Sequence, residues 1–170
     1  MADLSSTDAA YLREAIAWAQ KGVDAGGSAF GAVIVRTHDA DGEPLAEPER
    51  VVAVHNVVLQ TTDITAHAEV HALREACRAL GTIDLGGCTL YSSCEPCPMC
   101  FSAIHWANVD RIVYGATIAD ADRCGFRELP ISNRDMKRLG GAPVEVDGPH
   151  LRDEAVAVFD AFVERGGTTY

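Results

Sequence analysis

Apolar residues in the first part of the chain change from a helical to a strand-like spacing. N-cap residues at positions 5–8 precede a segment with apolar residues at helical intervals, which stops before Gly26-Gly27: Leu12, Ile16, Ala19 and Val23. This spacing predicts a helix. Residues 30–36 and 51–55 read as two short strands. Residues 38–50 between them contain Asp-Gly, two prolines and many charges, which predicts a long hairpin loop.

The rest of the chain alternates between the two spacings. Helices are predicted at residues 67–80 and 97–106, and the segments after them, residues 88–92 and 111–115, read as strands. Residues 132–139, 144–146 and 151–164 add a helix, a strand and a helix. This order predicts an α/β fold with a mixed sheet covered by helices on both faces. No repeat or long linker divides the chain, so we expect a single domain over residues 1–170.

Composition narrows the class of protein. A chain of 170 residues with 48% hydrophobic residues is long enough for one core. Nothing resembles a signal peptide or a membrane span, and we expect a cytoplasmic protein without membrane contacts. The net charge of −11 comes from 14 basic and 25 acidic residues. It disfavours a nucleic-acid substrate, because no basic stripe is present to bind phosphates.

Two short motifs carry the candidate chemistry: His67-Ala68-Glu69 and Glu95-Pro96-Cys97-Pro98-Met99-Cys100. One imidazole and two thiolates form a three-ligand zinc set that leaves the fourth tetrahedral position open for water, as in catalytic sites. The Glu69 carboxylate lies two residues from the histidine and can move protons without binding the metal. This combination is the signature of zinc-dependent nucleobase deaminases.

The predicted helix starts suit this ligand set. Cys97 and Cys100 are three residues apart, so their sulfurs face the same way in the first turn. The positive end of the helix dipole and the metal both favour thiolates there. Water on such a zinc ion has a pKa of about 7. Glu69 would take its proton, protonate a ring nitrogen and then the departing amine, which describes hydrolytic deamination.

Structural roles are the competing interpretation of these residues. A Cys-x-x-Cys pair alone is more typical of a zinc ribbon or a redox pair, but a second pair is absent. A His67-x-x-x-His71 metalloprotease would need Glu at position 68, where Ala68 stands. We expect His55, His71 and His105 to have structural roles. The remaining cysteines are expected to be small buried side chains, and Cys94 stands out beside the motif: Cys77, Cys88, Cys94 and Cys124.

The chain resembles the cytidine-deaminase-like superfamily, and within it the bacterial guanine deaminases. The resemblance rests on both metal motifs, on Phe30-Gly31-Ala32-Val33 and on Trp106-Ala107. It implies a three-layer α-β-α fold with a central five-stranded mixed sheet and one zinc ion per chain. It also implies Asp120 as a second catalytic carboxylate, and substrate contacts at these residues: Phe30, Asn56, Ala68, Trp106 and Tyr170. Purely structural roles compete with these, such as a core position for Phe30 or a solvated loop position for Asp120.

The resemblance further implies a homodimer, possibly with exchange of C-terminal segments. Residues 151–170 contain an apolar stripe at helical spacing, which could equally face the chain's own sheet: Ala155, Val158, Phe159 and Phe162. The expected substrate is a small nucleobase, with guanine preferred. Residues 38–50 and 127–138 depart from the family pattern, so guanosine or an aminotriazine such as ammeline stays open. So do a tRNA adenosine deaminase, a cytosine or cytidine deaminase, and a catalytically idle zinc module.

Overall fold

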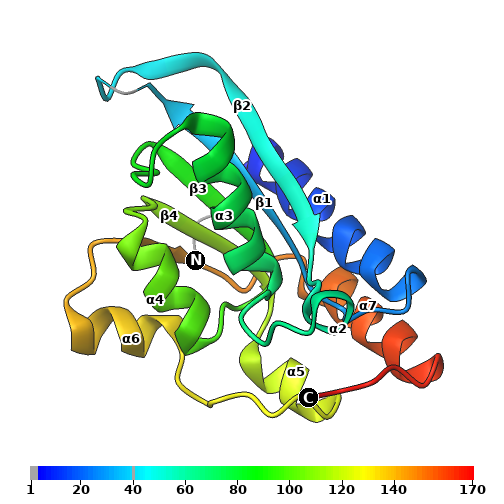
Figure 1. The fold of residues 1–170 in the computed structure, drawn as a ribbon. Coiled ribbons are helices and arrows are strands. Elements are labelled where there is room, and N and C mark those ends of the chain that lie inside the picture. Colours follow the sequence, from blue (N-terminus) through cyan, green and yellow to red (C-terminus); the bar gives the residue numbers. More distant parts are fainter. Residues whose placement is uncertain (1–3, 40) are drawn as a thin grey trace.

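The computed structural model describes residues 4–39 and 41–170 and contains a five-stranded sheet in the order β2-β1-β3-β4-β5 (Figure 1). β1 is antiparallel to both of its neighbours, whereas β3, β4 and β5 are parallel to one another. The strands are β1 (Gly31–His38), β2 (Pro44–His55), β3 (Cys88–Cys94), β4 (Arg111–Ala116) and β5 (Glu145–Asp147). The sheet is therefore mixed, as the sequence predicts.

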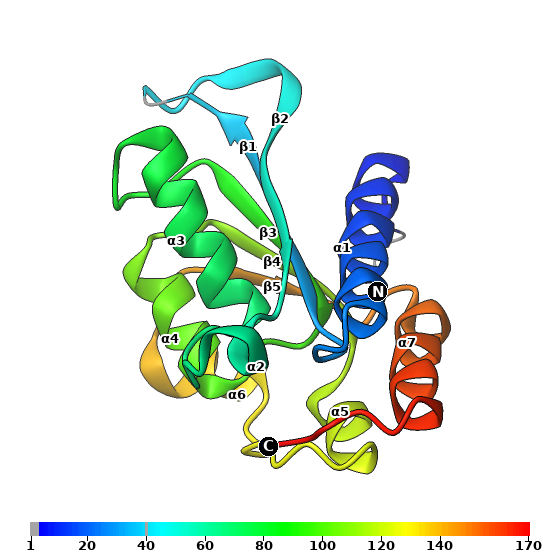
Figure 2. The same cartoon turned by 45° about the vertical axis from the view of Figure 1, so that its right-hand side comes forward.

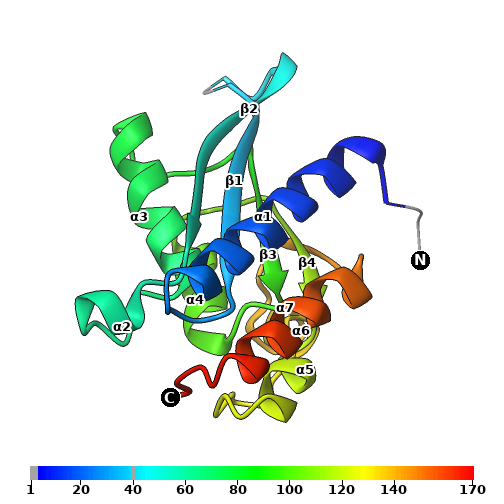
Figure 3. The same ribbon diagram turned by 90° about the vertical axis from the view of Figure 1, so that its right-hand side faces the viewer.

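Helices cover both faces of this sheet (Figure 2). On one face α3 and α4 pack together, and on the other α1 and α7 lie side by side, as Figure 3 also shows. The helices are α1 (Ser6–Asp24), α2 (Val58–Thr61), α3 (Ala68–Leu80), α4 (Pro98–Trp106), α5 (Ile118–Arg123), α6 (Asn133–Gly140) and α7 (Arg152–Glu164). The α/β fold class with three layers, α-β-α, is confirmed.

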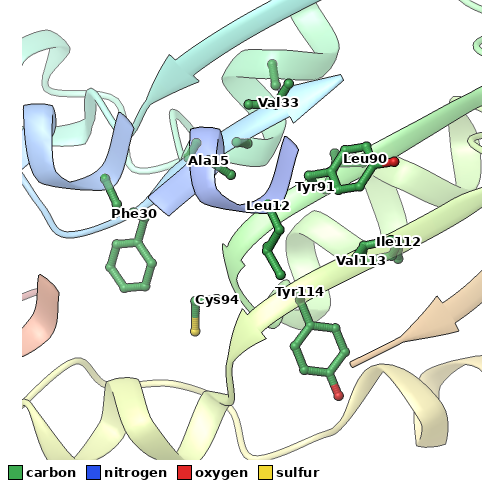
Figure 4. Close-up of a cluster of buried hydrophobic side chains, with 14 of the residues drawn as sticks. Leu12, Ala15, Phe30, Val33, Leu90, Tyr91, Cys94, Ile112, Val113 and Tyr114 are labelled. Carbon is green, nitrogen blue, oxygen red and sulfur yellow. The ribbon is translucent and has the colours of Figure 1, made fainter. Parts of the chain in front are cut away.

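The core lies on both faces of the sheet, and one glycine sets the spacing between α1 and the sheet. Ser5 caps α1 by accepting from the Asp8 backbone N–H, and Leu12 of α1 is completely buried, as is Val33 of β1 (Figure 4). A Cβ atom at Gly31 would lie 2.2 Å from the Ala15 carbonyl oxygen. Only glycine therefore lets α1 come this close to the start of β1.

The prediction of a long hairpin loop at residues 38–50 is wrong, because β2 begins at Pro44. Residue 40 of that segment lies outside the described residues. β2 is an edge strand, so its charges face solvent and Pro48 needs no further strand as a hydrogen-bond partner. Bulges interrupt its pairing with β1. The helices α2 and α5 were not predicted; they are only 4 and 6 residues long.

The apolar stripe of α7 faces the chain's own core. Ala155, Val158, Phe159 and Phe162 are 1–6% exposed. The stripe is thus satisfied within one copy and gives no support to a dimer. Among the helices of residues 4–39 and 41–170, none is long and apolar enough to cross a membrane.

Candidate active site

Two helix N-termini bring the metal motifs together. His67 is the N-cap residue of α3, and Cys97 is the N-cap residue of α4. Pro98 follows at the first position of α4, where its missing N–H leaves no hydrogen bond unmade. β3 ends at Cys94, so the second motif comes directly off the carboxyl end of a central strand. The predicted placement of both motifs at helix starts is confirmed.

The three predicted ligands form one compact cluster. The Cys97 Sγ and Cys100 Sγ atoms are 3.6 Å apart, and each lies 3.6 Å from His67 Nδ1. All three donor atoms lie within 4.8 Å of one another. One imidazole and two sulfurs at this separation fit a zinc ion with a free fourth position. Cys94 is outside the set, because its thiol is directed to the Thr117 carbonyl oxygen at 3.4 Å.

The electrostatics of the cluster also favour a cation. A hydrogen bond from Cys100, together with one from His67, lowers the pKa of the Cys97 thiol to about 4. That same hydrogen bond and burial raise the pKa of Cys100. Burial lowers the pKa of His67, but Cys97 and Glu69 outweigh it and the net shift is upward. A divalent metal would replace these shared protons and hold both sulfurs as thiolates.

Glu69 lies directly beside the cluster and is 4% exposed. Its Oε2 atom is 3.5 Å from Cys100 Sγ, and the Ser92 hydroxyl donates to its Oε1 atom at 3.1 Å. Burial, followed by the charge of Cys97, raises the pKa of this carboxyl. A buried, oriented carboxylate with a raised pKa next to a metal site is what general acid–base chemistry requires.

A cavity of about 340 Å³ opens over the cluster and includes His67 and Cys97 in its wall. Aromatic rings form much of the rest, with Phe126 edge-on to Phe30 at 4.8 Å between ring centroids. Phe30 therefore lines the pocket and also belongs to the core. A larger cavity, about 760 Å³, is lined by Arg36, Asp84 and Asp110 at the opposite end of the sheet and contains none of the cluster.

Tyr170 closes this pocket from the same chain. Its ring centroid lies 6.1 Å from that of His67 and 5.9 Å from that of Phe126. The Asn56 side-chain amide donates to the Tyr170 hydroxyl at 2.6 Å. Asn56 is 1% exposed and lies behind the phenol rather than in the pocket wall. The structure thus brings both predicted substrate contacts to the site, with the tyrosine covering the asparagine.

Other predicted site residues lie elsewhere. Asp120 is not in the pocket wall, because its carboxylate caps α5 through Thr117 and binds the Arg152 guanidinium. Trp106, at the end of α4, is 82% exposed and also lies outside the wall. Ala68 is buried at the start of α3. The family resemblance implied Asp120 as the second carboxylate, and the structure gives Asp120 a structural environment instead.

Glu128 is the acidic residue that sequence reasoning missed. It lines the pocket two residues after Phe126. Burial, followed by the charges of Cys97 and Glu69, raises the pKa of this carboxyl to about 7. No sequence pattern singled Glu128 out. The chain turns tightly here, with the Glu128 backbone N–H donating to the Phe126 carbonyl oxygen at 3.0 Å, and Arg127 and Leu129 line the pocket as well.

The other histidines and cysteines have ordinary environments. His71 Nδ1 lies 3.1 Å from the His55 carbonyl oxygen, and the His55 ring stacks on Trp18. All six cysteines are free. Cys88 and Cys94 are buried as expected, whereas Cys77 and Cys124 are half-buried.

Comparison with known proteins fits this geometry. Residues 5–116 match the model of the cytidine and deoxycytidylate deaminase zinc-binding region. The chain belongs to this deaminase family. The match includes both metal motifs and Glu69, so the cluster is the zinc-binding region of a hydrolytic deaminase.

Relatives within the deaminase family carry different substrate names. The guanine deaminase of Bacillus subtilis is 47% identical over 117 residues, 68% of this chain and 69% of that protein. A probable cytosine deaminase of Schizosaccharomyces pombe is 34% identical over 174 aligned positions, 96% of this chain and 97% of that protein. The tRNA-specific adenosine deaminase of B. subtilis is 40% identical over 109 residues, 64% of this chain and 62% of that protein. The family alone does not assign the base.

Among solved structures, a guanine deaminase from Nitrosomonas europaea has a similar fold. It superposes with a TM-score of 0.78 at 28% sequence identity. The match covers 94% of this chain and 86% of that chain. At this coverage the similarity extends beyond residues 5–116, which the family model matches.

Proposed function

We propose that this deaminase hydrolyses a purine-type nucleobase, most favourably guanine, to the oxo base and ammonia. The observation that carries the proposal is the buried Glu69 carboxylate beside three metal donors under an aromatic pocket. A structural metal site has no use for such a carboxylate. This argues against a catalytically idle zinc module.

The mechanism follows from the positions of the side chains. His67, Cys97 and Cys100 would hold zinc, which when bound supplies a Lewis acid that makes water a nucleophile near neutral pH. Glu69 takes a proton from the attacking water and delivers one to the ring nitrogen beside the attacked carbon. It then takes the second proton from the hydroxyl group added to that carbon and passes it to the amino group, which leaves as ammonia while the C=O bond of the oxo base forms. Ser92 keeps the Glu69 carboxylate oriented between these transfers.

The pocket walls support a flat and uncharged substrate. The Phe30 and Phe126 rings and the Tyr170 ring surround a volume that suits one or two fused rings. Glu128, with its pKa of about 7, can either accept from an amino group or donate to a ring nitrogen at neutral pH. We assign to Glu128 the role of second catalytic carboxylate, which the resemblance gave to Asp120.

The net charge of the protein favours a free base over a polynucleotide as the substrate. With 25 acidic and 14 basic residues, the chain repels a polyanion but not a neutral base. This supports guanine over a tRNA anticodon, although a tRNA-specific relative exists. Guanosine or ammeline would be accommodated by the same chemistry and stays within the proposed class.

Ammonia release tests the proposal. Zinc-loaded protein is offered guanine, guanosine, ammeline, cytosine, adenosine and a tRNA anticodon stem-loop under identical conditions. We expect turnover of guanine with kcat/KM at least about tenfold above the others, and none on RNA. Adenosine-to-inosine conversion in the RNA, with guanine untouched, would replace the proposal by its main rival.

A further inference from the structure

A buried hydroxyl next to the pocket has no assigned role. The Ser28 side chain is 0% exposed, and its Oγ atom forms no hydrogen bond of good geometry within the described part of the chain. Buried hydroxyl groups are nearly always hydrogen-bonded, because leaving one unpaired is unfavourable. The Ser28 hydroxyl can therefore form a well-aligned hydrogen bond once an acceptor better placed than the nearby Tyr170 oxygen lies beside it.

Ser28 lies in the loop that enters β1, next to Asn56. It precedes Phe30 of the pocket wall by two residues, and the Phe30 carbonyl oxygen accepts from the Asn56 backbone N–H at 3.0 Å. The Asn56 Oδ1 atom accepts from the Val58 backbone N–H at 3.0 Å. This bond fixes the orientation of the amide, so Asn56 can only donate toward the pocket.

The Tyr170 phenol fills the space between these two side chains. Burial raises the pKa of the phenol, whereas the Ser28 and Asn56 side chains act in the opposite direction, which places both beside its oxygen. Asn56 donates to that oxygen at 2.6 Å. We call the space the Ser28–Asn56 slot. The slot holds the Tyr170 hydroxyl oxygen, which is attached to an aromatic ring. The oxo oxygen of a heterocyclic base is likewise attached to a flat ring and accepts hydrogen bonds.

We propose that Ser28 is a specificity-determining residue that, with Asn56, binds the oxo oxygen of the base in place of the Tyr170 phenol. The inference rests on the proposed function and adds a second donor to the recognition of the substrate. An oxo oxygen accepts two hydrogen bonds, one from the fixed Asn56 amide and one from the Ser28 hydroxyl. An amino group at the same ring position would point its N–H donors at the N–H donor of the Asn56 amide, so no hydrogen bond could form between them.

The slot thus selects guanine over 2,6-diaminopurine, which has an amino group where guanine has the oxo group. Ser28→Ala removes one donor and adds no bulk. The ratio of kcat/KM for guanine to that for 2,6-diaminopurine should fall at least about fivefold, the usual effect of one hydrogen bond. Zinc content and melting temperature should stay as in the wild type. Ser102→Ala is the matched control, since its hydroxyl caps a carbonyl on the exposed face of α4.

Binding gives a readout that does not depend on turnover. In the Glu69→Gln background, calorimetry with 8-azaguanine and with 2,6-diaminopurine measures recognition alone. Ser28→Ala should weaken 8-azaguanine binding about fivefold and change 2,6-diaminopurine binding much less.

The outcomes separate this inference from the proposed function. The slot is disproved if the wild type deaminates guanine but Ser28→Ala lowers kcat/KM equally for guanine and 2,6-diaminopurine, or for neither. The hydroxyl would then be only structural. If the wild type deaminates none of the purines, and 8-azaguanine binding is the same with and without Ser28, both the proposed function and the slot fail.

Discussion

Glu128 shows how a single residue couples the pocket to pH. Its pKa is raised from the ordinary 4.5 to about 7, first by burial and then by the charges of Cys97 and Glu69. In metal-free protein the folded state therefore keeps a proton that the unfolded chain loses at lower pH. The associated stabilisation is complete below about pH 4.5 and is lost as the pH rises through about 7.

We therefore predict that Glu128→Gln flattens this loss in metal-free protein. The free energy of unfolding of the wild type should fall between pH 4.5 and pH 7 by on the order of 1–3 kcal/mol more than that of the variant. Urea unfolding at several pH values measures it, with Glu164→Gln, an exposed position on α7, as the control. If the free energy of unfolding depends equally on pH in the wild type and in Glu128→Gln, the pKa of the Glu128 carboxyl is not raised in the folded protein.

At the residue scale the sequence predicted the metal donors and their neighbour Glu69, because ligand chemistry fixes residue types and short spacings. It did not predict which acidic residue reaches the pocket. The resemblance offered Asp120, and only the fold shows that Arg152 and the α5 cap engage Asp120 while Glu128 lines the pocket. Nor could it show that Tyr170 covers Asn56, since the two are 114 residues apart in the chain.

At the scale of elements, the packing of α1 on β1 depends on Gly31. A Cβ at that position would lie 2.2 Å from the Ala15 carbonyl oxygen and 2.4 Å from the Ala19 backbone nitrogen. Both atoms belong to the backbone of α1, so they cannot move aside as a side chain would. We predict that Gly31→Ala lowers the free energy of unfolding by about 1–3 kcal/mol or more.

The matched control is Gly140→Ala, at the end of α6, where a Cβ meets no atom within 4 Å. It should leave stability unchanged or raise it slightly. Thermal or urea unfolding of the two variants measures the difference. Similar values for both would mean that α1 tolerates displacement from the sheet.

The regular elements of the core were predictable, because buried strands and amphipathic helices carry strong spacing signals. The predicted and the observed elements differ where tertiary contacts override these spacing signals. β2 extends through charged residues because it pairs on one side only and exposes its other edge. α5 forms over Asp-rich sequence because Thr117 and Asp120 make a capping box.

At the scale of the molecule, the homodimer implied by the resemblance stays a prediction. Trp106, at the end of α4, is 82% exposed, and tryptophan is enriched where proteins bind a partner. We expect sedimentation equilibrium to give a dimer at micromolar concentration. Trp106→Lys should weaken dimerisation at least about tenfold, and exposed Val163→Lys on α7 is its control. A monomeric wild type would remove this expectation.

The central claim is that the cluster of His67, Cys97 and Cys100 with Glu69 performs hydrolytic deamination of a free base. The most direct measurement is mass spectrometry of the product formed from guanine in ¹⁸O-labelled water, with wild-type and Glu69→Gln protein of equal zinc content. We predict xanthine that carries one heavy oxygen for the wild type, and a rate lower by about 10²–10⁴-fold for the variant. Unlabelled product, or equal rates with and without the carboxylate, would contradict the account.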